Sequence, residues 1–361
     1  MLASSKRLGV IDGWRAIACM GVLYIHVMGL LQQPTCFIAG IDVFKVLSIW
    51  GNGVHLFFVI SGFCFYWVMH GKQQWDIAAL IGFWKKRLLR IAPAFYVACM
   101  VYALVYFKTI NSAVLFKLAC NFLFIQPYVH GAEIAGIFWS LSVEWFFYIG
   151  LPFVFMAIKK WGYRIMLGPL LLLFILLNLA HYKGLLYNND FAWYYTIMGN
   201  FGHFVWGIII GRLYQTSKAT TWPFKSWVGF IVGLVIAYMG KVFYYSAWVT
   251  KMGTFGFLFE TIGPLLMTFG FAYMILVSLQ HPTIGKIIGN KYLAFVGKIS
   301  FSFYLWHALL LDVCFGVFQQ YLPNGPLQLV SLYILTTLVI IPISYLSYWL
   351  LESFYFRLQK S

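Results

Sequence analysis

Long apolar runs are the feature that most constrains how this chain can fold. Runs near the ~20 residues that cross a bilayer recur along it, at 14–33, 50–69, 86–107, 139–158, 165–182, 197–214, 227–246, 256–279, 296–318 and 328–350. Only 9% of the residues are charged, whereas a soluble domain has roughly 25%. The sequence therefore predicts an all-α polytopic integral membrane protein with about ten transmembrane helices.

The 25 Lys and Arg residues indicate how these helices are oriented. If the N-terminus is cytoplasmic and the runs alternate, most of these residues fall on the cytoplasmic side, as the positive-inside rule requires. We interpret the shorter run at 113–126 as interfacial or re-entrant, since a crossing there would reverse every later helix. We expect both termini in the cytoplasm of a multi-pass inner (cytoplasmic) membrane protein. Because this bias accounts for the formal charge of +16, lipids are the expected partner and nucleic acid is not.

The first run, "DGWRAIACMGVLYIH" (residues 12–26), carries ionisable groups, which cost several kcal/mol in hydrocarbon and so need a role. Arg15 and His26 are eleven residues apart. That spacing puts both on one helix face within about 20°, and ~16 Å apart along the axis. Either residue alone fits an anchoring arginine or a hydrogen-bonded core histidine. The pair on one face favours a functional site.

A basic cluster opens the third run, in "FWKKRLLRIAPAFY", where Lys86, Arg87 and Arg90 are neighbours at helical spacing. An ordinary cytoplasmic anchor is one interpretation, with Asp12 and Asp76 as protein partners. However, the chain has only nine acidic residues, and a buried arginine needs an anion. The cluster therefore favours a phosphate-bearing ligand that enters from the cytoplasm.

Further polar residues lie within other runs. "FWSLSVEWFFY" begins the fourth run and places Ser140 and Glu144 at i and i+4, beside Trp139. An intramembrane glutamate indicates a functional site; the alternative is a glutamate bonded to a neighbouring Trp or Tyr.

"GKISFSFYLWH" in the ninth run puts Ser300, Tyr304 and His307 on one face, with His307 near mid-depth. The second run has Ser61 at its middle, whereas His55 and His203 are weaker candidates. The six cysteines lack metal-ligand spacing, so we expect no metal site.

These segments, together with "VHLFFVISGF" and the closing "LLESFYFR", resemble the membrane acyltransferase-3 family in the family's own order, from residue 12 to 357. The resemblance implies transfer of an acyl group, usually acetyl from acetyl-CoA, to a sugar hydroxyl of an extracytoplasmic or lipid-linked glycan such as O-antigen, lipopolysaccharide or exopolysaccharide. It also implies that Arg15 and His26 are essential and that Arg87 and Arg90 help to bind the donor. The "RIAP" segment departs slightly, because the family more often has an aromatic residue before the proline.

The resulting prediction is one transmembrane acyltransferase domain over residues 1–361, without the hydrolase domain that many relatives append, and with acyl-CoA as co-substrate and no bound cofactor. The alternative is a proton-coupled small-solute transporter, which would leave Arg87 and Arg90 unexplained. Glu144 either orients a histidine or binds acceptor hydroxyls. The predicted site residues are catalytic His26, Arg15 and Glu144; donor-binding Lys86, Arg87 and Arg90; and lining Asp12, Ser61, Trp139, Ser140, Tyr304 and His307.

Overall fold

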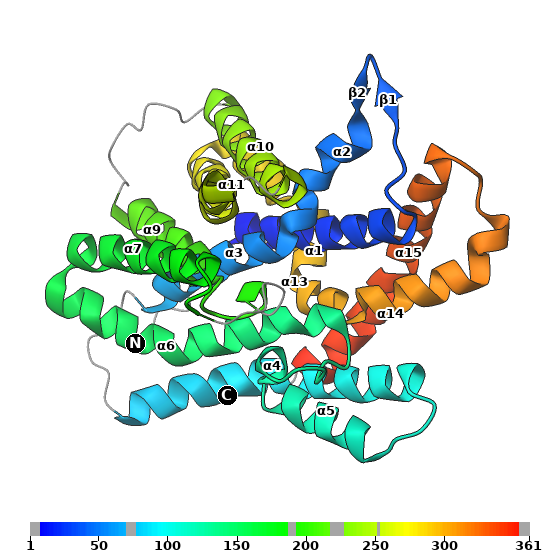
Figure 1. Cartoon of the computed structure of the whole chain (residues 1–361), viewed down its shortest axis with the longest axis horizontal. Helices are drawn as coiled ribbons and strands as arrows, with labels where there is room; N and C mark the ends of the chain where they lie inside the picture. Colours follow the sequence, from blue (N-terminus) through cyan, green and yellow to red (C-terminus); the bar gives the residue numbers. More distant parts are fainter. Residues whose placement is uncertain (1–7, 70–76, 187–192, 217–226, 251–252, 354–361) are drawn as a thin grey trace. The chain divides into compact units, whose positions relative to one another are not determined.

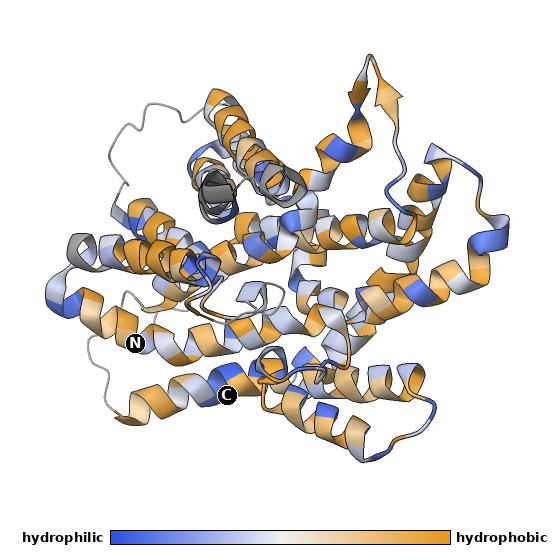
Figure 2. Cartoon of the chain, viewed as in Figure 1, coloured by the Kyte–Doolittle hydropathy of each residue, from blue (hydrophilic) through white to orange (hydrophobic). Residues whose placement is uncertain are grey.

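The fold is almost entirely helical. The computed structural model describes residues 8–69, 77–186, 193–216, 227–250 and 253–353, and Figure 1 shows the course of the chain. Eight helices of the described part are long and apolar enough to cross a membrane, and the long helices are hydrophobic over most of their length (Figure 2). The prediction of an all-α polytopic membrane protein is confirmed.

The N-terminal part consists of a long helix, a small hairpin and a second long helix. Helix α1 (Gly9–Leu30) is followed by strands β1 (Phe37–Ile38) and β2 (Ile41–Asp42), helix α2 (Val43–Leu47), the 3₁₀ turn η1 (Ser48–Asn52) and helix α3 (Gly53–Met69). Helix α1 begins at Gly9 rather than at residue 14. Asp12 therefore lies in its first turn, where a carboxylate interacts favourably with the helix dipole.

Helix α4 (Ile77–Tyr106) begins nine residues before the predicted start at 86. The segment "IAALIGFW" contains no proline, and the helix continues through Gly82, so the basic cluster lies inside the helix rather than at its first turn. A helix of 30 residues is about 45 Å long, which exceeds the ~30 Å hydrocarbon core. Its ends therefore extend beyond the core.

The segment after α4 contains short elements. They are α5 (Ser112–Phe122), η2 (Gln126–Tyr128) and η3 (Gly136–Phe138). At 11 residues, α5 is about 16 Å long. It is too short to cross a bilayer, as the interfacial or re-entrant interpretation requires.

The middle of the chain follows the predicted runs closely. Its helices are α6 (Trp139–Trp161), α7 (Tyr163–Tyr182), α9 (Phe201–Thr216), α10 (Trp227–Thr250) and α11 (Gly253–Gln280). The runs at 165–182 and 197–214 correspond to α7, with 20 residues, and α9, with 16. Neither is among the eight long apolar helices of the described residues, so the total of about ten crossings stays a prediction.

The predicted ninth run is divided between two helices. The C-terminal elements are α12 (Pro282–Ile288), α13 (Lys291–Lys298), α14 (Ser300–Phe318), η4 (Gln319–Tyr321), α15 (Pro326–Ser347) and the π-helical turn η5 (Tyr348–Glu352). The expectation of one helix over 296–318 is wrong, because the chain breaks at Ile299, with φ −98° and ψ 7°. The low helix propensity of Gly297, two residues earlier, favours this break. Ser300, Tyr304 and His307 all lie on α14, as predicted.

The chain forms two compact units, each built from three segments. Unit 1 comprises Met1–Trp14, His55–Gly82 and Leu141–Ala294; unit 2 comprises Arg15–Val54, Phe83–Ser140 and Phe295–Ser361. Within unit 1, α10 lies beside α11 (Figure 1). Helices α3 and α9 approach closely there, because a Cβ added to Gly62 would lie 2.2 Å from the Phe204 carbonyl oxygen. Within unit 2, α14 lies beside α15.

Candidate functional site

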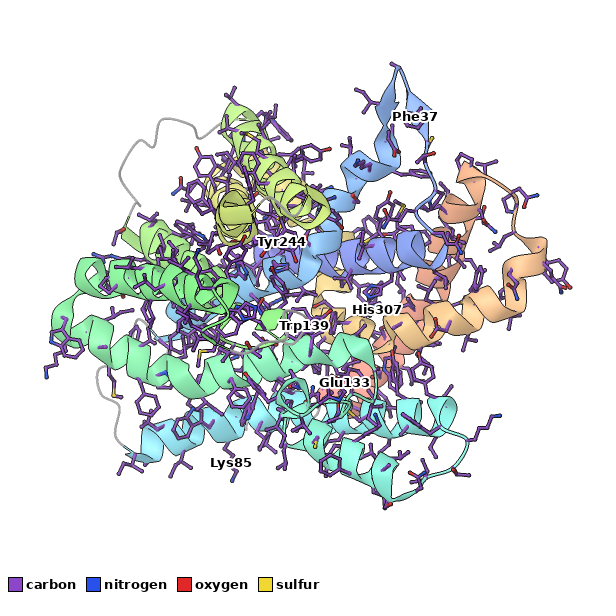
Figure 3. All side chains as sticks on the ribbon, viewed as in Figure 1. Phe37, Lys85, Glu133, Trp139, Tyr244 and His307 are labelled. Carbon is purple, nitrogen blue, oxygen red and sulfur yellow. The ribbon has the colours of Figure 1, made fainter. Side chains whose placement is uncertain are left out.

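Two histidines from distant parts of the sequence face each other in unit 2. The rings of His26 on α1 and His307 on α14 have centroids 4.9 Å apart and planes inclined at 66°. His307 is fully buried and His26 is half-buried; Figure 3 labels His307. The structure thus brings together the two mid-helix histidines that the sequence singled out separately.

Backbone hydrogen bonds set the tautomer of both rings. Nδ1 of His26 lies 2.7 Å from the Val22 carbonyl oxygen, and Nδ1 of His307 lies 2.6 Å from that of Tyr304. A carbonyl can only accept, so each Nδ1 carries the proton of the neutral ring and each Nε2 is the basic nitrogen. Nε2 of His307 is buried and has no hydrogen-bond partner within the described part of the chain.

Close packing fixes α1 near His26. A Cβ added to Gly21 would lie 2.0 Å from the Trp50 carbonyl oxygen, so only glycine permits this approach. The Tyr24 hydroxyl donates to the Phe44 carbonyl at 2.9 Å, and the Tyr333 hydroxyl donates to Met20 at 3.2 Å. The His26 turn is therefore held by the segment of η1 and α2 and by α15.

A second polar contact joins α14 to the start of α6. The Tyr304 hydroxyl donates to the Ile137 carbonyl at 2.6 Å, and Ser140 Oγ lies 2.7 Å from the same hydroxyl. Since a tyrosine hydroxyl has one proton, Ser140 is the donor to Tyr304. Ser140, predicted to share a face with Glu144, thus contacts Tyr304; Trp139 beside it is half-buried.

The basic residues of α4 differ in exposure. Lys86 is exposed, whereas Arg87 and Arg90 are half-buried, and the Arg87 guanidinium lies 5.3 Å from the Phe83 ring centroid. Figure 3 labels the neighbouring Lys85, which is exposed. Donor binding by this cluster stays a prediction.

Arg15 belongs to unit 2, whereas Asp12 belongs to unit 1. Arg15 is half-buried on α1, eleven residues before His26 and so about 16 Å away along the axis. Asp12 is buried in unit 1, and Asp76 lies outside the described residues.

Unit 1 contains the predicted glutamate. The Ser61 hydroxyl donates to Glu144 Oε1 at 2.8 Å, and the Tyr148 hydroxyl donates to the same oxygen at 2.5 Å. Ser61 and Glu144 were both predicted as site residues. Tyr148 was missed, although its i+4 spacing from Glu144 is a signal in the sequence.

A second histidine pair also lies in unit 1. The rings of His55 on α3 and His203 on α9 have centroids 4.8 Å apart and an interplanar angle of 87°. Nδ1 of His203 lies 3.1 Å from Thr268 Oγ1, which donates to the Pro264 carbonyl at 2.9 Å. The threonine proton is thus used, so His203 Nδ1 donates and its Nε2 is basic. The sequence ranked both as weaker candidates.

Comparison with known proteins identifies the family. A family model described as an acyltransferase domain matches residues 8–349, nearly the whole chain. The chain belongs to the acyltransferase-3 family. This finding confirms the resemblance seen in the motifs from residue 12 onward.

Curated relatives are similar over most of this chain. "Putative O-acetyltransferase SACOL0978" of Staphylococcus aureus (strain COL) is 26% identical over 95% of this chain and 56% of its own length. "Peptidoglycan O-acetyltransferase OatA" of Listeria monocytogenes is 25% identical, over 89% of this chain and 52% of its own length. "Putative acetyltransferase ORF330" of Acidianus two-tailed virus is 24% identical, over 84% of this chain and 83% of its own length.

The chain spans about half the length of the staphylococcal and listerial relatives that it matches. No solved structure matches it significantly.

The His26–His307 pair gives this acyltransferase-3 protein two basic nitrogens with fixed tautomers. A neutral imidazole with a lone pair on Nε2 can take a proton from a hydroxyl group and return it to a leaving group. Among the described residues, no group of three or more His, Cys, Asp and Glu side chains is placed to hold a metal ion. The geometry of the His26–His307 pair by itself is suited to acid–base chemistry.

Proposed function

We propose that this chain is a membrane O-acetyltransferase. It would transfer an acetyl group from cytoplasmic acetyl-CoA to a hydroxyl of an extracytoplasmic or lipid-linked glycan. The observation that carries the proposal is the His26–His307 pair, whose basic Nε2 atoms are both set by backbone carbonyls. Family membership and the names of the relatives support the reaction type.

His26 is the proposed general base. Its Nε2 takes the proton from the acceptor hydroxyl as the oxygen attacks the thioester carbonyl carbon. A C–O bond forms, the C–S bond breaks, and the imidazolium returns its proton to the CoA thiolate. Catalysis of this kind typically contributes about 10²–10⁴-fold in rate. His307, at 4.9 Å between ring centroids, stabilises the ring of His26 and contacts the incoming hydroxyl.

The proposed donor site is the basic cluster on α4. CoA carries about four negative charges, and Arg side chains bind phosphate through paired, charge-assisted hydrogen bonds. Arg87 and Arg90 are both half-buried, so water competes with them less than with the exposed Lys86. Arg15 adds a further positive charge on α1, the helix that also carries His26.

The proposed acceptor is a glycan of the cell surface. The listerial relative is named for peptidoglycan, and O-antigen, lipopolysaccharide and exopolysaccharide present the same kind of hydroxyl group. The apolar helices support a multi-pass membrane protein, and the proposed location of the site is a cytoplasmic membrane, between a cytoplasmic donor and an external acceptor. Glu144, held by Ser61 and Tyr148, is a candidate to bind acceptor hydroxyls.

Acetyl transfer in nanodiscs tests this proposal. Purified protein receives radiolabelled acetyl-CoA and surface glycans from the host cell, and both released CoA thiol and glycan-bound label are measured. We expect turnover in the wild type and a loss of about 10²-fold or more in His26→Gln. The exposed His130 supplies the control, since His130→Gln should retain full activity.

The alternative is transport. Absence of CoA release with every glycan fraction, together with proton-coupled solute flux in proteoliposomes, would replace the enzyme proposal with the transporter. Turnover that survives in His26→Gln would remove the assignment of the base but not the activity.

A further inference from the structure

A buried tyrosine from α4 enters the backbone hydrogen-bond ladder of α14. The Tyr102 hydroxyl donates to the Leu305 carbonyl at 2.9 Å and accepts from the Leu309 amide at 3.0 Å. These two backbone groups are the i and i+4 partners that bond to each other in a regular α-helix. The hydroxyl therefore contacts both partners of one rung of the backbone ladder.

The bridged turn is the one that carries His307. Residues 305 and 309 flank His307 on each side, and His307 Nδ1 donates to Tyr304, one residue before the bridge. A side chain that inserts into the ladder changes the local helix geometry. The direction of the imidazole depends on that geometry, because its Nδ1 bonds to a carbonyl of the same turn.

Packing holds Tyr102 in this place. Its side chain is fully buried, and its ring contacts Phe138 in an edge arrangement at 5.0 Å and stacks with Trp306 at 6.5 Å. Both neighbours belong to unit 2, as do Tyr102 and His307. A hydroxyl on a buried, packed ring has one available position, so the bridge is a fixed part of the α14 backbone.

We propose that Tyr102 is a positioning residue for His307: its hydroxyl sets the backbone of the 305–309 turn and thereby the direction of His307 Nε2 toward His26. This inference rests on the proposed function only where it concerns turnover. Tyr102 itself need not touch substrate.

Tyr106 offers a matched control. It is also on α4, and its hydroxyl donates at 2.7 Å to a side chain of α14, Asp312. That contact is exposed and does not involve the α14 backbone. Tyr102→Phe and Tyr106→Phe thus remove the same atom from the same helix pair, but only the first removes the bridge.

The test compares both variants as full-length protein in nanodiscs. In Tyr102→Phe the Leu305 and Leu309 backbone groups keep each other as hydrogen-bond partners, so the fold should persist while kcat falls about 10- to 100-fold, as expected when a catalytic group is misplaced by about 1 Å. The KM for acetyl-CoA should stay within about twofold, since the donor cluster is not touched. Tyr106→Phe should keep both constants within about twofold.

A second readout does not depend on turnover. In protein labelled with ¹⁵N-histidine, the His307 Nε2 resonance is assigned by its loss in His307→Gln. We expect a single unprotonated-nitrogen signal in wild type and Tyr106→Phe, and a shifted or doubled signal in Tyr102→Phe. A shifted signal in a protein with no acetyl transfer would retain the positioning role while the proposed function fails. Unchanged kcat and an unchanged signal in Tyr102→Phe would overturn the positioning role.

Should Tyr102→Phe unfold, 4-aminophenylalanine at position 102 keeps a donor at the same point. Rescue of kcat to within about threefold of wild type supports the bridge. Folded protein that carries this residue but lacks activity, with the His307 resonance unmoved, contradicts it.

Discussion

Ser61 on α3 donates a hydrogen bond of 2.8 Å to Glu144 Oε1 on α6. Tyr148, one turn further along α6, donates to the same oxygen at 2.5 Å. In apolar surroundings a carboxylate has little water to replace a lost donor. This contact therefore stabilises the folded unit 1 as well as the position of the glutamate.

Ser61→Ala should lower both stability and activity. A hydrogen bond to a charged group contributes about 1.5–3 kcal/mol. We therefore expect a lower unfolding temperature and a higher KM for the acceptor. Tyr148→Phe should act in the same direction. Differential scanning fluorimetry and initial rates measure the two effects, with the exposed Ser112→Ala as control. Wild-type values in both variants would show that the carboxylate is held by other groups.

Loss of Arg90 should weaken donor binding. Removal of a charge-assisted bond to phosphate costs about 1.5–3 kcal/mol, or roughly 10- to 150-fold in affinity, so Arg90→Ala should raise the KM for acetyl-CoA. Because salt screens such contacts, the wild-type KM should climb with ionic strength more steeply than that of the variant. Initial rates at two salt concentrations measure this. The exposed Lys85→Ala is the control, and equal KM values throughout would remove α4 from the donor site.

Gly207→Ala should prevent α3 and α9 from packing. A Cβ at this position would lie 2.0 Å from the Val59 carbonyl oxygen, and backbone cannot move away as a flexible side chain can. We expect aggregated or degraded protein, visible by fluorescence size-exclusion chromatography. At Gly316 a Cβ would meet nothing within 4 Å, so Gly316→Ala should behave as wild type. Normal yield of both variants would mean that α3 and α9 do not approach as described.

A buried network between α14 and the end of α15 should contribute to stability. Ser302 Oγ lies 2.5 Å from Glu352 Oε1 and 3.0 Å from Ser347 Oγ, and Trp306 Nε1 donates to Ser347. Ser302→Ala removes a short donor from a carboxylate that is 3% exposed, so we expect a loss of about 1–3 kcal/mol. Unfolding measurements in detergent check this against the exposed Ser112→Ala; equal stability would count against the network.

Both ends of the segment between α4 and α6 should face outward. Single cysteines at Lys108 and Gly131, which are both exposed, are placed in a chain that lacks the six native cysteines. Each should react with an impermeant thiol reagent added to intact cells, since α5 is too short to cross. A position that reacts only after permeabilisation would reverse the predicted orientation from that point onward.

Periodicity and length made the helices predictable, because an apolar run of spanning length has few alternatives to a helix. Arg15, His26, Glu144 and His307 could be selected because ionisable groups in apolar runs are rare. The break at Ile299 could not be predicted, because no proline marks it and it depends on the local backbone conformation.

Contacts between segments that are distant along the chain could not be predicted from the sequence either. The meeting of His26 with His307, and of His55 with His203, depends on which helices pack together. The Tyr102 bridge depends on a few ångströms of packing. Spacing along one helix says nothing of either.

The interleaved course of unit 2 has a consequence for biogenesis. Its three segments include α1 near the beginning of the chain and α14 and α15 near its end. A ribosome must therefore synthesise and insert every segment from α1 to α14 before His26 meets His307. Until then α1 lies in the bilayer without its native contacts to α14 and α15. In that state it is accessible to quality-control proteases and can pack against the wrong helices. A nascent chain that has not yet reached α14 thus carries no assembled histidine pair.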